Sequence, residues 1–357
     1  MPRTPLPRAD SGFWGQLEFP IIGLSPMDGV TDAPYRLITA RYGHPALTVT
    51  EFTSVEGIRA GATRLLDDFL YDPLERPVVA QLFGADPEAF FLAAVVASAL
   101  GFDGIDINMG CPAKNVTSHG AGAALILDPE RASHIIERAK AGAKAWTDGI
   151  TLEEAGVTES LLPEINLRRH RLGIADERPS ARPVSVKTRM GYHQPVVETW
   201  ISHLLESKPA AISLHGRTLK QLYTGDADWE SIGKAATLVR QTPTLILGNG
   251  DISSLADAHE KISIYGVDGV LIGRASQGNP WVFTGENASL TQRLQVALEH
   301  ARLFDAAFPP AAFVRMRKHL LDYVKGFEGA KELRTSLMRV NGLAEVEALL
   351  LPATRQE

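Results

Sequence analysis

The chain contains one cysteine, Cys111, in the segment DINMGCPAKNV, and its thiol is the first candidate for chemistry. Gly110 and Pro112 flank it, which predicts a loop rather than a helix. A lone cysteine forms no internal disulfide, so the thiol is left for packing or for reaction. As a nucleophile it would need a base, for which His119 and His215 are candidates. As a proton donor it needs only to keep its hydrogen at the working pH.

Lys187 is the second candidate and ends the apolar run in PVSVKTRMG. A buried ammonium group without a partner is costly, so Lys187 should pair with a carboxylate or face an electron-rich ligand. A Schiff-base lysine is one such use, and stabilising the negative charge that develops on a reduced flavin is another. Gln81 and His215 would offer neutral hydrogen bonds to the edge and ribityl chain of that ring.

Two glycine-containing turns suggest an anion site. Asn249-Gly250-Asp251 and Gly273-Arg274 follow two successive apolar runs. Glycines in such turns let backbone N–H groups approach an anion, and Arg274 would add a bidentate contact. Tight turning alone is the structural alternative, but the occurrence of both turns in consecutive loops favours phosphate binding.

Eight short apolar or β-branched runs alternate with helix-patterned stretches, as in parallel βαβ units. The runs are residues 20–25, 46–51, 77–83, 104–108, 183–188, 210–215, 244–248 and 269–273. Polar residues follow the C-terminal ends of these runs, namely Glu51, Gln81, Asn108, Lys187, His215, Asn249 and Arg274. A (β/α)₈ TIM barrel would bring them to one mouth, and an open doubly wound sheet is the alternative. We therefore predict an α/β fold with a TIM barrel.

The chain of 357 residues is long enough for a barrel and a smaller domain. We expect a loose N-terminal arm over residues 1–18 and the barrel over 19–285, with an insertion at about 147–182. Apolar residues then recur at helical spacing over 290–308, 311–327 and 331–350. This spacing predicts a C-terminal all-α domain over 286–350.

Composition limits the function classes. A formal net charge of −6 argues against a uniformly basic nucleic-acid binder. The apolar run 89–100 is too short to cross a bilayer, and the N-terminus lacks a secretory apolar core, so we expect a cytoplasmic protein without a membrane segment. Because CxxC, HExxH and GxGxxG patterns are absent, we expect no metal, and a nicotinamide such as NADPH would have to bind transiently.

Nine segments, in this order, resemble the tRNA-dihydrouridine synthases. They are LSPMDGVTDAPYR, TEFTS, RPVVAQLFGADPEAF, GIDINMGCPAKNV, PVSVKTRMG, LHGRTLKQLYTGDADW, GNGDI, GVLIGRA and MRKHLLDYVKGFEGAKELR. The resemblance implies an FMN-binding barrel, a helical domain that helps hold tRNA, and NADPH-dependent reduction of uridine to 5,6-dihydrouridine. Cys111 falls on the family's acid, which protonates C5 while flavin N5 passes hydride to C6.

The resemblance also implies which residues bind the cofactor. Pro26, Met27 and Asp28 would lie against the isoalloxazine, and Gln81, Lys187 and His215 would contact it. Asn249, Gly250, Asp251, Gly273 and Arg274 would hold the ribityl-phosphate end. Asn108 and Arg189 are expected to contact the uracil edge, and Glu51 to help organise the mouth.

Basic residues support a nucleic-acid substrate. Residues 311–340 contain seven Lys and Arg against three Asp and Glu. Arg315, Lys318, Lys325 and Arg334, together with Tyr323, would suit RNA phosphates, with a solvated helix face as the alternative. In the insertion, Arg168, Arg169 and Arg171 give a further hypothesis of RNA contact.

Two other functions stay open at this point. The first is a flavin barrel reductase or dehydrogenase acting on a free pyrimidine or another small molecule, which would not need a basic helical domain. The second is a tRNA-binding protein without turnover, against which Cys111 and Lys187 argue. We expect the protein to be a monomer.

Overall fold

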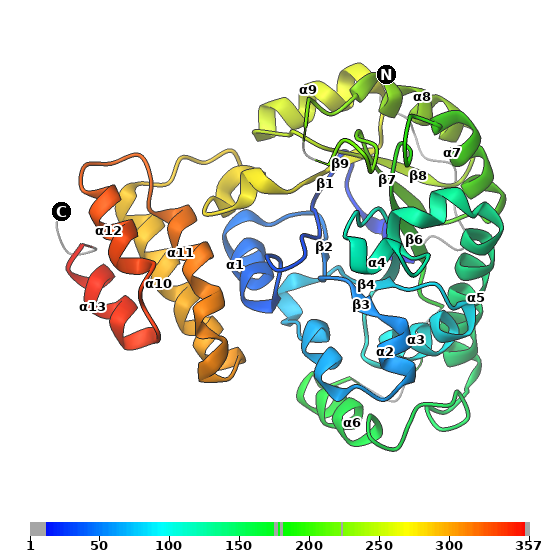
Figure 1. Cartoon of the computed structure of the whole chain (residues 1–357), viewed down its shortest axis with the longest axis horizontal. Coiled ribbons are helices and arrows are strands. Elements are labelled where there is room, and N and C mark those ends of the chain that lie inside the picture. Colours follow the sequence, from blue (N-terminus) through cyan, green and yellow to red (C-terminus); the bar gives the residue numbers. More distant parts are fainter. Residues whose placement is uncertain (1–11, 175–177, 179–180, 223, 354–357) are drawn as a thin grey trace.

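The computed structural model describes residues 12–174, 178, 181–222 and 224–353, and its larger part is a closed parallel barrel (Figure 1). The barrel strands in this part are β1 (Ile21–Leu24), β2 (Thr48–Val49), β4 (Val78–Phe83), β5 (Gly104–Met109), β6 (Val184–Arg189), β7 (Ala211–His215), β8 (Leu245–Asn249) and β9 (Gly269–Ile272). Hydrogen-bonded neighbours follow the order β1-β9-β8-β7-β6-β5-β4-β2. The Leu24 N–H donates to the Leu47 carbonyl at 3.0 Å and closes the ring between β1 and the entry to β2. The predicted TIM barrel is confirmed.

The second predicted strand is interrupted. After β2 the chain bends, and a short strand, β3 (Thr53–Ser54), pairs again with β4. The Thr50 hydroxyl accepts a hydrogen bond from the Gln81 N–H at 2.9 Å and donates to the Glu51 carbonyl at 2.8 Å. These bonds satisfy backbone groups that a continuous ladder would have paired.

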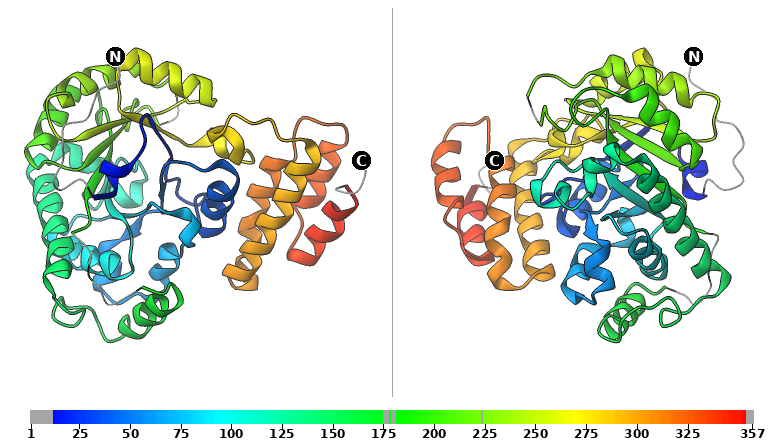
Figure 2. Two further views of the ribbon diagram at one scale, coloured as in Figure 1. Left: turned by 180° about the vertical axis from the view of Figure 1, so that it is seen from behind. Right: turned by 45° about the vertical axis from the view of Figure 1, so that its right-hand side comes forward.

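Helices cover the outside of the barrel (Figure 2). They are α1 (Ala33–Gly43), α2 (Val55–Arg59), α3 (Pro87–Ala99), α4 (Lys114–Thr117), α5 (Pro129–Asp148), α6 (Leu162–Arg171), α7 (Val197–Glu206), α8 (Trp229–Val239) and α9 (Leu255–Tyr265). Short 3₁₀ turns are η1 (Gly12–Gln16), η2 (Thr63–Phe69), η3 (Pro73–Glu75), η4 (Gly122–Leu127), η5 (Arg274–Ser276), η6 (Pro280–Phe283) and η7 (Pro310–Arg315). Asp32, Asp86 and Asp128 each cap a helix that has proline in its first turn. These sequence signals explain where the three helices begin.

The C-terminal domain is a separate group of helices beside α1 (Figure 1). It comprises α10 (Leu290–Ala307), α11 (Met316–Tyr323), α12 (Ala330–Leu337) and α13 (Leu343–Ala353). The expectation of one helix over 331–350 is wrong, because the chain leaves the helix after Leu337 and turns through Asn341-Gly342 before α13. Val340, in the turn, is buried with Leu337 in the domain's own core, so the apolar spacing persisted across the break.

The two domains meet on a packed polar seam. The Tyr35 ring of α1 lies 5.9 Å from the His300 ring and 5.5 Å from the His319 ring of the helical domain, and its hydroxyl hydrogen-bonds Ser276 of the barrel at 2.8 Å. Burial lowers the pKa of His300 to about 3. The histidines are therefore neutral at physiological pH and act as packing groups of the seam.

The N-terminal arm is not loose over its described part. In η1, Trp14 is 3% exposed and packs against Leu47, Val79 and Leu271 at the N-terminal end of the barrel. The expectation failed because one aromatic ring buries enough apolar area to hold a short segment in place. Residues 1–11 lie outside the described residues.

The insertion packs against the barrel through α6. The Arg168 guanidinium pairs with Asp67 of η2 at 3.0 Å, and Arg169 lies 5.2 Å from the Trp146 ring centroid. Two of the three arginines assigned to RNA by hypothesis are thus engaged within the protein, while Arg171 is exposed. In the described part of the chain, no helix is both long enough and apolar enough to span a membrane.

Candidate active site

Strand register brings the predicted polar residues to one mouth. Asn108 lies beside Lys187 across β5 and β6, and His215 lies beside Asn249 across β7 and β8. Arg189 pairs in register with His215 between them. Because all strands are parallel, these side chains share the C-terminal end of the barrel, as the sequence predicted.

Cys111 lies in the loop after β5 and is half-buried. The Asn108 side-chain oxygen accepts hydrogen bonds from the backbone N–H groups of Gly110 at 3.0 Å and Cys111 at 2.8 Å. Burial raises the pKa of the Cys111 thiol above its ordinary value. The thiol therefore keeps its proton at neutral pH, which suits a proton donor better than a thiolate nucleophile.

A buried chain of polar groups supports this loop from inside the barrel. Ser185 donates to Asp106 at 2.7 Å, and the Gln81 amide donates to the other Asp106 oxygen at 2.7 Å. The Asn108 amide then donates to the Gln81 side-chain oxygen at 3.0 Å. Gln81 is fully buried, so the contact with a cofactor predicted for it stays a prediction, as does the uracil contact of Asn108.

Lys187 faces the same interior. Its ammonium group donates to the Asn249 side-chain oxygen at 3.1 Å, and the Asn249 amide donates to the Leu271 carbonyl at 2.8 Å. Burial, with help from nearby Arg189, lowers the pKa of Lys187 to about 8. An ammonium group held by a neutral amide keeps most of its charge available for a ligand.

His215 is neutral at the mouth. Burial and the positive charges of Lys187 and Arg189 lower the pKa of His215 to about 2. A permanently neutral imidazole can donate or accept a hydrogen bond but does not act as a base toward Cys111 near neutral pH. The prediction of neutral hydrogen bonding by this residue agrees with its surroundings.

The loops after β8 and β9, where the sequence predicts an anion site, meet around Asp251. Arg217 contacts both oxygens of Asp251, at 2.6 and 3.1 Å, and Arg274 contacts one at 2.5 Å. A Cβ at Gly250, where φ is +125°, would lie 2.7 Å from the Ala227 Cβ, so the turn needs glycine. Two guanidinium groups converging on one carboxylate would equally suit a phosphate. Asp251 itself would repel a phosphate, so its part is to position the arginines.

The loop after β1 completes the mouth. The Thr31 hydroxyl accepts from the Met27 N–H at 2.9 Å, which fixes the turn that carries Pro26 and Asp28. Pro26 and Met27 are half-buried and Asp28 is exposed. A Cβ at Gly273 would lie 3.3 Å from the Met27 sulfur, so the loops after β1 and β9 touch here.

Arg189 connects two further loops of the mouth. It donates to the Gly110 carbonyl at 2.7 Å and to the Thr218 carbonyl at 3.2 Å, and it is buried. It therefore ties the Cys111 loop to the loop after β7. Its predicted contact with uracil stays a prediction.

This arrangement can be compared with known proteins. A sequence model of the family described as dihydrouridine synthase matches residues 23–145 and 177–357. The chain belongs to the dihydrouridine synthase family. The resemblance inferred from the motifs is confirmed, and residues 146–176, within the insertion, lie outside the match.

Curated relatives agree with this assignment. A probable tRNA-dihydrouridine synthase of Staphylococcus aureus (strain COL) is 34% identical over 351 residues, covering 95% of this chain and 94% of the relative. The probable tRNA-dihydrouridine synthase 2 of Bacillus subtilis (strain 168) is 33% identical over 348 residues, covering 95% of each chain. The solved structure of morphinone reductase with tetrahydroNAD covers 79% of this chain and 89% of its own at 12% identity, with a TM-score of 0.40, too distant to add to the assignment.

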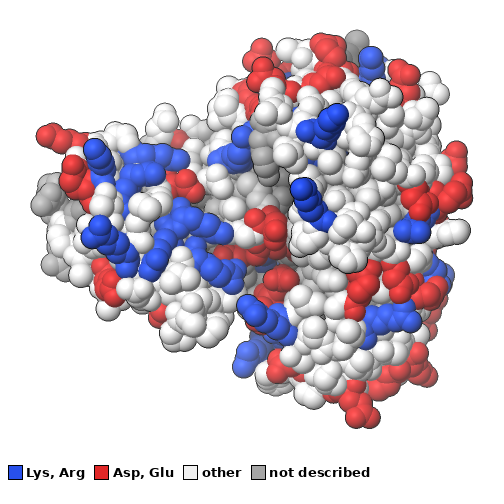
Figure 3. Space-filling view, viewed as in Figure 1, with Lys and Arg blue, Asp and Glu red and all other residues white. Residues whose placement is uncertain are grey.

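The basic residues of this dihydrouridine synthase differ in how they are used. Lys318 and Lys325 are exposed. Figure 3 shows that Lys and Arg side chains gather on one face of the helical domain. Arg334 is half-buried and donates to the Leu321 and Val324 carbonyls at the end of α11. The expectation that Tyr323 meets RNA is wrong, because its ring is 2% exposed and its hydroxyl lies 3.2 Å from His300.

The partners of Arg317 and Arg217 could not be predicted from the sequence. Arg217 was not among the predicted cofactor residues of this dihydrouridine synthase, although it stands in the quoted motif LHGRT, because only the fold shows that it reaches Asp251. Arg317 contributed to the local positive charge, yet it donates to the Val340 carbonyl at 2.8 Å and to Asn341.

Among the described residues there is no group of three or more His, Cys, Asp or Glu that could hold a metal ion.

Proposed function

We propose that the chain reduces uridine in tRNA to 5,6-dihydrouridine, with FMN as its cofactor and NADPH as the reductant. The observation that carries the proposal is the half-buried Cys111 thiol, kept protonated at a mouth that also presents Lys187. Membership of the family and the printed names of the relatives support the tRNA substrate.

The residues at the mouth fit FMN. Arg217 and Arg274 would hold the phosphate, with Asp251 keeping them in place. Pro26 and Met27 would lie along the ring, and the Lys187 ammonium would face its electron-rich edge. When bound, FMN supplies the hydride that adds to C6 of uracil.

The protein's own part in the reaction is proton donation and positioning. Cys111 would protonate C5 from the face opposite the ring, and the hydrogen bonds from Asn108 fix the loop that aims its thiol. Lys187 would stabilise negative charge near the ring edge. A uridine stacked in RNA cannot present its C5–C6 bond, so the target base must be turned out into the mouth.

The helical domain would hold the RNA backbone. Lys318, Lys325 and Arg315 are exposed, and Arg315 lies 3.8 Å from Asp32 at the junction with the barrel. Such contacts make affinity fall with salt. The roles of Arg334, Asn108 and Arg189 toward substrate, and a monomer in the cytoplasm, stay predictions.

The test is direct. Purified protein loaded with FMN is incubated with NADPH and an unmodified tRNA transcript, and dihydrouridine is measured by mass spectrometry of the digested RNA. Free uridine and uracil serve as parallel substrates. We expect dihydrouridine in tRNA only. Turnover of the free pyrimidines without turnover of tRNA would instead support the small-molecule reductase.

A further inference from the structure

A cleft lies between the barrel and the helical domain, with about 670 Å³ of empty space that is partly open to solvent. The start of α1, the bend between β2 and β3, and η2 form its barrel side, and residues 308–315 form its other side. The cleft adjoins the mouth of the barrel, because Asp32 ends the loop after β1 that carries Met27 and Asp28, and Glu51 follows β2.

Two buried carboxyl groups in this cleft have oxygens without hydrogen bonds. Asp32 is 3% exposed; one oxygen accepts from the Tyr35 N–H at 3.1 Å, and the other has no partner among the described residues. The guanidinium group of Arg315 lies 3.8 Å from it and the neutral ring of His319 lies 3.9 Å from it, both beyond hydrogen-bonding distance. Glu51 is 7% exposed, and within the described part of the chain its carboxyl group forms no hydrogen bond. A fully buried acceptor without a partner, such as the second Asp32 oxygen, is rare and costly.

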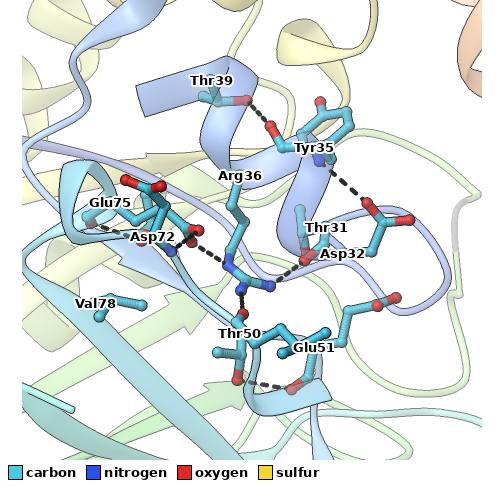
Figure 4. Close-up of polar contacts among 12 residues, drawn as sticks. Thr31, Asp32, Tyr35, Arg36, Thr39, Thr50, Glu51, Asp72, Glu75 and Val78 are labelled. Atoms are coloured by element: carbon cyan, nitrogen blue, oxygen red, sulfur yellow. Dashed lines mark hydrogen bonds and ion pairs between the residues drawn. The ribbon is translucent and has the colours of Figure 1, made fainter. Parts of the chain in front are cut away.

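Arg36 also lines the cleft, but its hydrogen bonds go to groups other than these two carboxyls. Figure 4 shows Arg36 between η3 and the loop before α1, where it donates to Glu75 at 2.7 Å and to the Thr31 carbonyl at 2.7 Å. In the same view the carboxyl groups of Asp32 and Glu51 point to the same side, away from Glu75. Burial is the main reason that the pKa of Asp32 rises to about 6 and that of Glu51 to about 7. A ligand with hydrogen-bond donors would therefore stabilise the ionised forms of Asp32 and Glu51 in this cleft.

The charged and aromatic residues at the rim of the cleft indicate which kind of ligand would bring these donors. Arg64 is exposed on the barrel side, and Arg315 lies over the Phe308 ring at 5.0 Å on the other side. Asp67 and Asp68 also line the cleft, but Asp67 pairs with Arg168 and Asp68 accepts a hydrogen bond from Thr53. The two rim arginines therefore remain available to a ligand that carries negative charge outside the cleft. Phe308 adds an aromatic surface on which a planar group can stack. A nucleotide unites these properties, with a flat base for the interior and a phosphate for the rim.

We propose that the cleft binds a guanine base of the substrate RNA, close in the chain to the uridine that is reduced. Of the four RNA bases, guanine alone presents two adjacent N–H donors, N1–H and N2–H, on its Watson–Crick edge, which match a carboxylate. Glu51 and Asp32 accept these hydrogen bonds, and Arg64 or Arg315 contacts a neighbouring phosphate. The inference rests on the proposed function and adds a second base site to it.

The first arm of the test uses the wild-type enzyme. Inosine, which lacks the N2 amino group, replaces one guanosine at a time in a tRNA transcript that the FMN-loaded enzyme reduces. We expect one guanosine near the target where inosine lowers kcat/KM about ten- to hundredfold, the effect of losing one hydrogen bond to a charged group. Inosine at distant guanosines is the internal control. If no guanosine shows such sensitivity, the base site is wrong.

The second arm ties that guanosine to the cleft. Glu51→Gln keeps the shape of the side chain but replaces an accepting oxygen with an amide, so it should raise the KM for tRNA and remove most of the inosine effect. Asp305→Asn, an exposed change on α10, is the matched control and should keep the full effect. If Glu51→Gln folds poorly by circular dichroism, Asp32→Asn replaces it, because asparagine can still cap α1.

The outcomes separate the two proposals. Full inosine sensitivity in a folded Glu51→Gln enzyme would refute the guanine site while leaving uridine reduction intact. Absence of dihydrouridine from every tRNA with the wild-type enzyme would refute the proposed function instead.

Discussion

Replacing Asn108 with alanine tests whether the loop that carries Cys111 is held as described. The change removes two hydrogen bonds to the loop and one to Gln81, whose buried oxygen would be left without its partner. Each loop bond contributes about 0.5–1.5 kcal/mol, and the unsatisfied Gln81 oxygen costs about 1–3 kcal/mol. Because the half-exposed loop can bind water in part, we expect the free energy of unfolding to fall by about 2–4 kcal/mol.

The same change should also impair proton donation. We expect dihydrouridine formation to fall by at least about tenfold while NADPH oxidation by the flavin continues, since misplacing an acid slows only the step that uses it. Chemical denaturation and single-turnover assays measure the two effects. Asn115→Ala, an exposed change in nearby α4, is the control and should leave both near wild type. An Asn108→Ala enzyme with unchanged unfolding and unchanged tRNA reduction would refute the role of this hydrogen-bond set.

Three further outcomes are expected. Cys111→Ala should keep FMN and its reduction by NADPH but lower uridine reduction by about 10²–10⁴-fold, and an equal loss in both half-reactions would assign the thiol another role. The pKa of Lys187 is lowered to about 8, so its ammonium charge is lost as pH rises through that value; kcat/KM should fall there, and a profile flat to pH 10 would exclude a need for the charge. Arg217→Ala should weaken FMN binding by about tenfold or more in fluorescence titration, as loss of a bidentate anion contact does, whereas Arg240→Ala, exposed at the end of α8, should bind normally.

The barrel and its mouth could be predicted because both follow from periodicity. Continuous apolar runs such as 77–83 and 244–248 indicate strands covered on both faces. The polar residue at the C-terminal end of each strand indicates which end of the barrel carries the site. That logic placed Lys187 and Asn249 at the same mouth, although their direct contact was not predicted.

Contacts made across loops could not be predicted in the same way. Asp106 alternates with apolar residues inside β5, so the sequence gives no sign that it receives hydrogen bonds from both Gln81 and Ser185. The break between α12 and α13 was missed because Val340 is buried within the turn and continues the apolar spacing. Tyr323 was assigned to RNA on composition alone, but its ring was needed for the seam between the domains.

The position of Trp14 has an effect at the opposite end of the barrel. Trp14 and Lys187 border one narrow internal cavity, together with Asp106 and Ser185. Removing the indole would enlarge this cavity at the base of the barrel and let water approach the ammonium group from that side. The pKa of Lys187 therefore depends on Trp14. An N-terminal truncation that removes Trp14 should bring the pKa of Lys187 closer to that of a solvent-exposed lysine.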